Sequence, residues 1–259
     1  MHKALLLIVG LMFASFVQAE SLERTLRLGC VQWPPYISDK LPGKGFLAEL
    51  SDLIVTASNQ HLDVVIMPWK RVVKGVDTGD LDGSLCMFKT EERKSRMHYI
   101  EPPLLIEQTV VFHRKEFTPE IEKLADLNNY HLGILDGSSY QKDEFIQKHP
   151  KLTVVNSFEN MFKMLAKGRV DIVLAEYRNG MAVIADTPSL DFEQFSVLPY
   201  SYQHTDVHIV ISHNAYKSEE LASHLNKVAG GVIKSASAKA LYERHGILEL
   251  PELKPLSSE

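Results

Sequence analysis

Residues 79–93, GDLDGSLCMFKTEER, with the closing segment YIEPP at 99–103, decide the fold of this chain. A helix that ends at Gly79 leads into an apolar strand from Leu81 to Phe88, and then into a polar turn that carries Arg93. A guanidinium is planar, always charged and able to hold a carboxylate through two parallel hydrogen bonds. The segment therefore predicts an α/β unit with a candidate anion-binding arginine beyond the end of a strand.

The strand-and-helix unit around this segment occurs twice. In the first copy we expect strands at 25–31, 62–67 and 81–88, with apolar residues at helical spacing from Phe46 and from Trp69. In the second copy we expect strands at 131–135, 152–155 and 170–175, a helix at 140–147 and another from Phe158 to Gly168. The motifs GDLD at 79–82 and GRVD at 168–171 hold equivalent places. Alternating strands and helices predict an α/β architecture with mostly parallel sheets, here in two similar lobes.

Two further runs are suited to cross between the lobes, at 109–112 and at 207–211, and apolar spacing after them predicts C-terminal helices. Two crossings place both ends of the chain in one lobe. We therefore expect a first lobe made of residues 20–110 and 208–259, and a second lobe made of 111–207.

The first 19 residues have the pattern of a secretory signal. A short basic start, His2-Lys3, precedes an apolar run at 4–17 and the small-x-small sequence Val17-Gln18-Ala19. The alternative, a membrane anchor, requires a run of about 20 apolar residues. We expect cleavage after Ala19 and a soluble, periplasmic product without a lipid anchor, since no cysteine follows the cleavage site.

Composition narrows the class of protein. The chain is 45% hydrophobic and 24% charged with a net charge of −5, and it has no basic run, which argues against nucleic acid as a partner. The two cysteines, Cys30 and Cys86, lie at the ends of predicted strands. They either form a disulfide, if those strands are neighbours in an oxidising compartment, or serve as two small buried apolar residues.

The whole mature chain resembles the bacterial extracellular solute-binding proteins of the polar amino acid type, family 3, through the segment at 79–103 and the two repeated units. The resemblance implies a type II periplasmic-binding-protein fold, in which two lobes, each a mostly parallel sheet flanked by helices, are joined by a two-strand hinge. It also implies a monomer without cofactor or metal, a small-molecule ligand in the cleft, and an ABC permease as partner.

The resemblance also implies roles for residues at strand ends. Arg93 would hold the carboxylate of the ligand, with Arg96 as its competitor if the register shifts. Ser138 and Ser139 would add a second carboxylate contact at the start of a helix, although Ser138 could simply cap that helix. Glu176 would meet the ammonium of the ligand, unless it is a solvated acid paired with Arg178.

Aromatic residues complete the expected site. Tyr36 and Trp33 flank a Pro-Pro turn and would cover the body of the ligand. Trp69 would do the same or else pack at the start of its helix.

Three departures from the family pattern concern the ligand. Phe88 stands where many relatives carry a Ser or Thr, which leaves Thr90 or a backbone N–H to assist Arg93. Val31 lies near the place where binders of basic amino acids carry an acid. Glu176 replaces a more usual aspartate. The expected ligand is a small polar amino acid or a related carboxylate.

Three classes of function are compatible with this pattern. Binding and delivery to an ABC importer is the first. A cyclohexadienyl dehydratase-like enzyme acting on prephenate, with Glu176 as general acid, is the second. A sensor that presents its ligand to a membrane receptor is the third. No phosphate loop, metal-ligand spacing or Ser-His-Asp arrangement favours another enzyme class.

Overall fold

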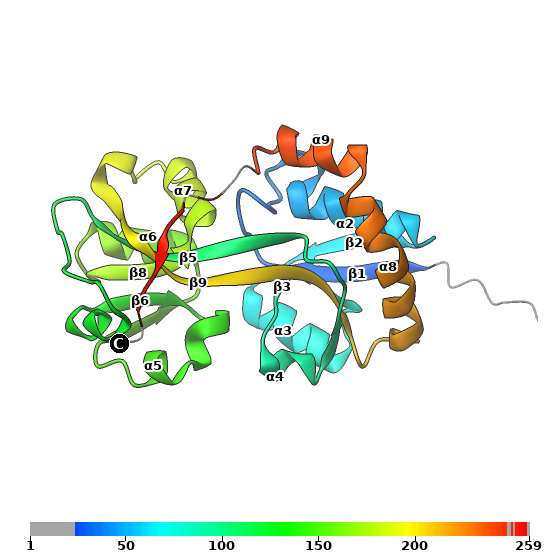
Figure 1. Cartoon of the computed structure of the whole chain (residues 1–259), viewed down its shortest axis with the longest axis horizontal. Helices are drawn as coiled ribbons and strands as arrows, with labels where there is room; N and C mark the ends of the chain where they lie inside the picture. The colour runs from blue at the N-terminus through cyan, green and yellow to red at the C-terminus, as the bar shows by residue number, and fades with distance from the viewer. Residues whose placement is uncertain (1–23, 248–249, 251, 258–259) are drawn as a thin grey trace, which may run out of the picture.

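The computed structural model describes residues 24–247, 250 and 252–257, so the predicted signal sequence lies outside the described residues. Two lobes are joined by two long antiparallel strands, β5 (Leu105–Arg114) and β9 (Phe195–Ser212) (Figure 1). One sheet runs through both lobes in the order β2-β1-β3-β9-β5-β8-β6-β7. The predicted α/β class with two lobes and a two-strand connection is confirmed.

The first lobe has a parallel core of β1 (Thr25–Cys30), β2 (His61–Ile66) and β3 (Gly83–Phe88), in which β1 lies between the other two. Its other elements are η1 (Pro42–Lys44), α2 (Phe46–Ala57), α3 (Trp69–Thr78), α4 (Glu91–Lys94), β4 (Met97–Tyr99), α8 (Ser218–Ile233) and α9 (Ala236–Arg244). Helix α3 ends at Gly79 in the left-handed conformation, with φ of 81°, as the sequence predicts.

The second lobe repeats this order. Its parallel core is β6 (Leu132–Leu135), β7 (Leu152–Val155) and β8 (Ile172–Glu176), with β6 between the other two. Its other elements are η2 (Leu124–Asn129), η3 (Ser139–Lys142), α5 (Glu144–Gln147), α6 (Phe158–Ala166), α7 (Tyr177–Asp186), η4 (Phe192–Gln194) and the tail strand β10 (Lys254–Pro255). The repeated unit read from the sequence is therefore a repeat in space.

The two segments predicted to cross between the lobes, 109–112 and 207–211, lie in different lobes. Residues 109–113 of β5 pair with β8 in the second lobe, whereas 207–211 of β9 pair with β3 in the first lobe. The strands change lobes between these runs, where Glu107 lies opposite Thr205 and Gln108 opposite His204.

The C-terminal tail corrects the expected division of the chain, which assigned all of 208–259 to the first lobe. Strand β10 pairs with Tyr200 and Ser201 of β9, Ser257 forms a bridge with Lys123, and Leu256 packs on the apolar core of the second lobe. Backbone pairing and the burial of an apolar side chain hold this tail on the second lobe, as the red strand in Figure 1 shows.

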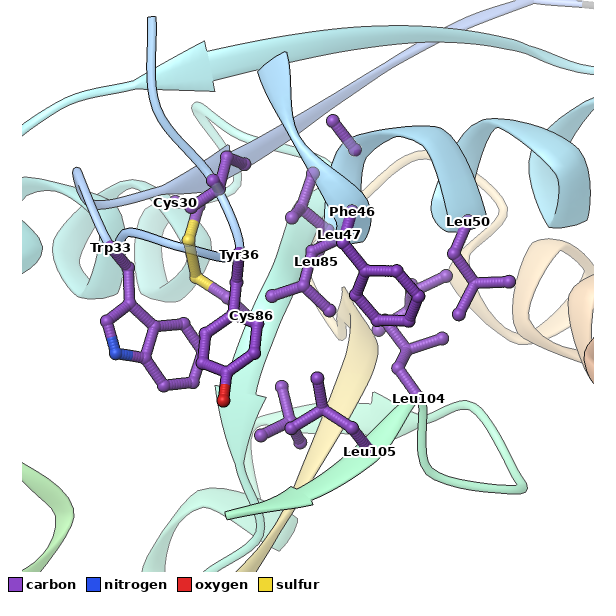
Figure 2. Close-up of a cluster of buried hydrophobic side chains, with 14 of the residues drawn as sticks. Cys30, Trp33, Tyr36, Phe46, Leu47, Leu50, Leu85, Cys86, Leu104 and Leu105 are labelled. Carbon is purple, nitrogen blue, oxygen red and sulfur yellow. A yellow bond between two sulfur atoms is a disulfide. The ribbon is translucent and has the colours of Figure 1, made fainter. Parts of the chain in front are cut away.

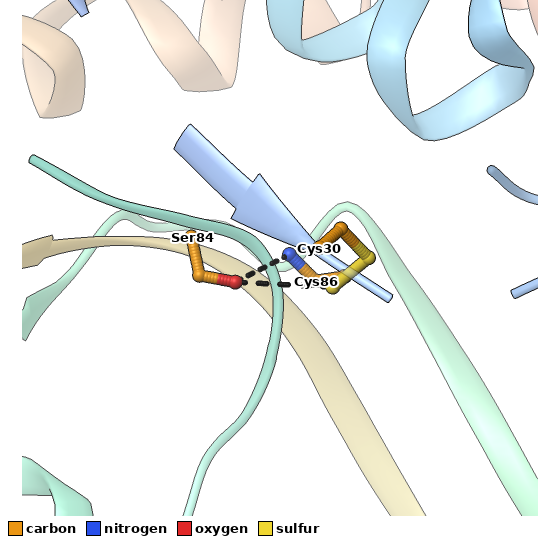
Figure 3. Close-up of a disulfide and its surroundings, with 3 residues drawn as sticks. All are labelled: Cys30, Ser84 and Cys86. Atoms are coloured by element: carbon orange, nitrogen blue, oxygen red, sulfur yellow. Dashed lines mark hydrogen bonds between the residues drawn. A yellow bond between two sulfur atoms is a disulfide. The ribbon is translucent and has the colours of Figure 1, made fainter. Parts of the chain in front are cut away.

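Cys30 and Cys86 form a disulfide between the adjacent strands β1 and β3, with their Cα atoms 5.8 Å apart. This decides between the two alternatives that the spacing left open. Figure 2 shows the disulfide beside Trp33 and Tyr36 in the apolar core of the first lobe. Figure 3 shows Ser84 next to it, where the Ser84 hydroxyl accepts the Cys86 backbone N–H at 3.3 Å. The described helices all fall short of the length and apolar character that a membrane span requires.

Candidate functional site

Arg93 lies in a one-turn helix, α4, which begins after the cap residue Thr90. The Thr90 hydroxyl accepts the Arg93 backbone N–H at 3.3 Å, which leaves the hydroxyl proton free to donate. The Arg93 side chain is buried, donates to the Phe88 carbonyl at 3.3 Å and stacks over the Trp69 ring at 5.5 Å from the ring centroid. Burial lowers the pKa of Arg93. In the described part of the chain no carboxylate forms an ion pair with it, so most of its donors remain available.

Ser138 and Ser139 lie across the cleft on the second lobe, after Gly137, whose φ of 78° opens the turn. The predicted helix at 140–147 is wrong in part: it is a single 3₁₀ turn, η3, followed by the short helix α5. The side chain of Ser138 makes no capping bond, and Ser139 Oγ accepts a hydrogen bond from Gln203 Nε2 at 3.2 Å. Because η3 is so short, we assign no anion site to its N-terminus.

Glu176 ends β8, opposite Thr109 of β5, and is 4% exposed. Burial raises the pKa of Glu176 to about 7, the charge of Glu107 adds to the rise, and the Trp33 indole N–H opposes it. Its Oε2 atom has no hydrogen-bond partner among the residues that the structure describes. The alternative of a solvated acid is wrong, because Glu176 is buried. Arg178 pairs with Glu107 at 3.0 Å.

Tyr36 departs from its expected place as a wall of the ligand site. Its side chain is fully buried among apolar residues of the first lobe (Figure 2). Its hydroxyl donates to Glu107. Burial raises the pKa of the Tyr36 hydroxyl well above its ordinary value. The turn that begins at Trp33, closed by the Trp33 N–H to Ile37 carbonyl bond of 2.8 Å, directs the tyrosine toward the hinge strand instead of the cleft.

Two connected pockets lie between the lobes. The inner pocket, about 40 Å³, includes Trp33, Trp69 and Glu176 in its lining. The outer pocket, about 620 Å³, includes Thr90 and Arg93. Trp69, Ser138 and Ser139 line both pockets and mark the boundary between them. Seven of the eight expected site residues therefore line this cleft, and Tyr36 does not.

The lobes touch each other directly around the cleft. Ion pairs join Lys70 to Asp136 and Lys142 to Glu92, each at 2.6 Å. Hydrogen bonds between the lobes include Trp69 Nε1 to the Gly137 carbonyl at 2.6 Å and Asn179 Nδ2 to the Pro34 carbonyl at 2.7 Å. This is a closed arrangement of the two lobes.

Sequence reasoning missed three residues that shape the cleft. Phe158 and Tyr140 line the inner pocket, and Gln203 of β9 holds the Ser139 hydroxyl. In the sequence, Phe158 and Tyr140 are large residues within predicted helices. Helical spacing alone does not indicate which side of a helix faces the cleft. Gln203 is a polar residue shortly before the crossing strand predicted at 207–211. That position is the one signal that could have indicated a place at the cleft.

A two-lobed clamp with a buried arginine facing an interlobe pocket is the architecture of a solute-binding protein. The chain belongs to the bacterial extracellular solute-binding proteins, family 3, whose family model matches residues 26–247. No curated protein sequence matches the chain significantly.

Solved structures with the same fold cover most of the chain. Holo ArgBP from T. maritima is 20% identical with a TM-score of 0.68, and the match covers 85% of this chain and 95% of that chain. An amino acid ABC transporter substrate-binding protein, AbpA from Streptococcus pneumoniae bound to L-arginine, is 19% identical with a TM-score of 0.70 over 85% and 94% of the two chains. A histidine kinase sensor domain with similarity to periplasmic binding proteins is 18% identical with a TM-score of 0.75 over 86% and 96%. At these identities the likeness establishes the shared fold.

Proposed function

We propose that this protein is an exported, periplasmic solute-binding protein that captures an amino acid or a related small carboxylate and delivers it to an ABC importer. The observation that carries the proposal is Arg93, a buried guanidinium that faces an interlobe pocket and has no carboxylate partner among the described residues. A buried charge without a counter-charge is costly, and an anionic ligand would offset that cost.

Capture and closure follow from the placement of the groups on the two lobes. Arg93 and Thr90 on the first lobe would bind the carboxylate, and Ser138 and Ser139 on the second lobe would reach it only when the lobes close. Glu176, also on the second lobe, would meet a hydrogen-bond donor of the ligand, such as an ammonium group. A ligand that contacts both lobes binds the closed state more tightly than the open state and so shifts the equilibrium toward closure.

The test is binding of amino acids and small carboxylates to refolded, ligand-stripped protein by calorimetry and thermal shift. Arg93→Ala should cost about 2–5 kcal/mol of binding free energy, as truncation of one partner of a buried charge pair does. Arg27→Ala is the matched control, because Arg27 is an exposed arginine on β1 that pairs with Asp63 at 3.6 Å. Equal affinity of the Arg93 variant and the wild type would remove Arg93 from the site.

A second candidate is favoured by Glu176. A buried carboxyl with a pKa near 7, in a pocket with apolar walls, is suited to act as a general acid at neutral pH. A cyclohexadienyl dehydratase-like enzyme would convert prephenate to phenylpyruvate, with loss of water and carbon dioxide. Turnover of prephenate by the wild type that Glu176→Gln abolishes would establish this function, and absence of turnover would exclude it.

A further inference from the structure

The inner pocket has an almost entirely apolar wall. Six aromatic or aliphatic side chains form most of it: Trp33, Trp69, Phe88, Leu135, Tyr140 and Phe158. Its one carboxyl is Glu176, which faces the Trp33 indole N–H, and the Ser138 and Ser139 hydroxyls lie at the boundary with the outer pocket. The Trp69 indole N–H and the Tyr140 hydroxyl donate to the Gly137 and Leu174 carbonyls. Among the residues that the structure describes, no lysine or arginine lines this pocket.

Arg93 and Glu176 line different pockets, and Trp69 lines both. The guanidinium of Arg93 lies over the Trp69 ring and lines the outer pocket, together with Lys70 and Lys142. A carboxylate held by Arg93 would therefore lie at the boundary between the pockets, where Ser138 and Ser139 line both. The remainder of the ligand would point into the inner pocket.

A ligand body in the inner pocket gains affinity from apolar groups and loses it from polar ones. Each buried methylene group strengthens binding about fourfold. A hydroxyl or amide that reaches this wall without a partner weakens binding about tenfold or more, because it gives up its hydrogen bonds to water. Glu176 can satisfy one donor on the ligand, and apart from the serine hydroxyls at the boundary the side chains of the remaining wall are largely apolar.

The size of the pocket limits the length of that body. A volume of about 40 Å³ has room for about three water molecules. It therefore fits an aliphatic group of about three or four carbons without a rearrangement of its walls.

We propose, resting on the solute-binding function above, that the ligand is a small carboxylate with a short aliphatic body, such as a branched aliphatic amino acid, and that Phe88 and Phe158 determine this specificity. This revises the expectation of a polar amino acid. Phe88 is packed edge-on against Trp33 at 5.6 Å between centroids, and Phe158 begins α6 on the opposite lobe. The two rings thus come from the two lobes and would enclose the aliphatic body between them when the lobes close.

Valine and threonine provide a matched pair of probes, because they have nearly the same shape and differ by one hydroxyl in place of a methyl. Calorimetry on refolded, ligand-stripped wild-type protein should show valine binding at least about tenfold more tightly than threonine. Glutamine and arginine should bind more weakly still. Equal or tighter binding of threonine, glutamine or arginine would overturn the inference.

A pair of Phe→Ser variants tests the role of the wall. Phe88→Ser should reduce the preference for valine over threonine to about threefold or less, because it removes an apolar ring and supplies a hydroxyl partner. Phe192→Ser is the control, since Phe192 is 45% exposed on the surface of the second lobe, and it should leave the ratio unchanged. An unchanged ratio in Phe88→Ser would remove Phe88 as a determinant of specificity.

The same titrations separate this inference from the proposed function. Binding of amino acids with a polar preference would overturn the aliphatic specificity and leave the solute-binding function in place. Failure of every amino acid and small carboxylate to bind would overturn the solute-binding function itself.

Discussion

Replacing Arg178 with alanine should destabilise the protein strongly in alkaline buffer and only weakly in mildly acidic buffer. Glu107 on the hinge strand β5 is fully buried and accepts hydrogen bonds from the Tyr36 hydroxyl of the first lobe and from Arg178 Nη1, at 3.0 Å, of the second. Burial raises the pKa of Glu107 to about 7, against the opposing effects of Tyr36 and Arg178. This cluster joins both lobes to the hinge.

The sign of the pH dependence follows from the direction of that shift. A carboxyl with a higher pKa in the folded than in the unfolded state contributes stability that is fully present below its unfolded pKa. For Glu107 this contribution is complete below about pH 4.5 and is lost as the pH rises through about 7. Without Arg178 the pKa of Glu107 rises further, so the carboxyl stays protonated where the wild type ionises. Each pH unit above 7 then costs the variant about 1.4 kcal/mol relative to the wild type. At a pH of about 8.5 the additional loss approaches about 2 kcal/mol, and at about pH 6 it is close to zero.

Urea unfolding followed by circular dichroism at these two pH values measures the difference. The effect of Arg178→Ala should be measured again in a Glu107→Gln background. Residue 107 no longer titrates there, so the loss caused by removing Arg178 should be the same at both pH values. This cycle isolates the coupling between the two side chains from the loss of arginine packing. An equal loss at both pH values in the Glu107 protein would refute the reasoning, because it would mean that the charge of Glu107 does not depend on Arg178.

Two further predictions concern stability. Replacing both Cys30 and Cys86 with alanine opens a loop with a sequence separation of 56, so the free energy of unfolding should fall by about 4 kcal/mol. Urea titration under non-reducing conditions measures this loss. A loss below about 1 kcal/mol would contradict the loop-entropy argument. At Gly83 an added Cβ would lie 1.8 Å from the Val210 carbonyl oxygen of β9. Gly83→Ala should therefore lower the free energy of unfolding by about 3 kcal/mol or more, which the same urea titration measures. Wild-type stability in that variant would show that β3 and β9 can move apart at no cost in free energy.

Local sequence predicted the elements of this fold well where apolar periodicity and breakers agreed. Helix α3 spans Trp69–Thr78 and is capped by Gly79, because valines at helical spacing are followed by a residue that tolerates the left-handed conformation. The prediction was poorer where tertiary contacts override local pattern. The stretch 140–147 divides into η3 and α5 because the Tyr140 ring is pulled into the core and its hydroxyl donates to the Leu174 carbonyl at 3.0 Å.

The sequence placed seven of the eight proposed site residues at the cleft, and it placed Tyr36 there as well, although Tyr36 is buried in the core. Trp33, Trp69, Arg93 and Glu176 line the cleft because they follow the carboxyl ends of strands or the turns near them, and strand ends meet at one edge of a parallel sheet. Tyr36 was misplaced because an aromatic residue after a proline can turn toward the cleft or toward the core, and the sequence pattern is the same in both cases.

The sequence by itself determined the repeated α/β units, the two-lobed class of the protein and the position of Arg93 beyond the end of a strand, because periodicity, breakers and motif spacing are local properties of a chain. Only the tertiary structure decided that Cys30 and Cys86 are bonded, that the C-terminal tail returns to the second lobe and that Glu107 is buried at the hinge. It also decided that the inner pocket is apolar. These depend on which distant side chains share a volume and on what surrounds each charge, and no spacing along the chain specifies either.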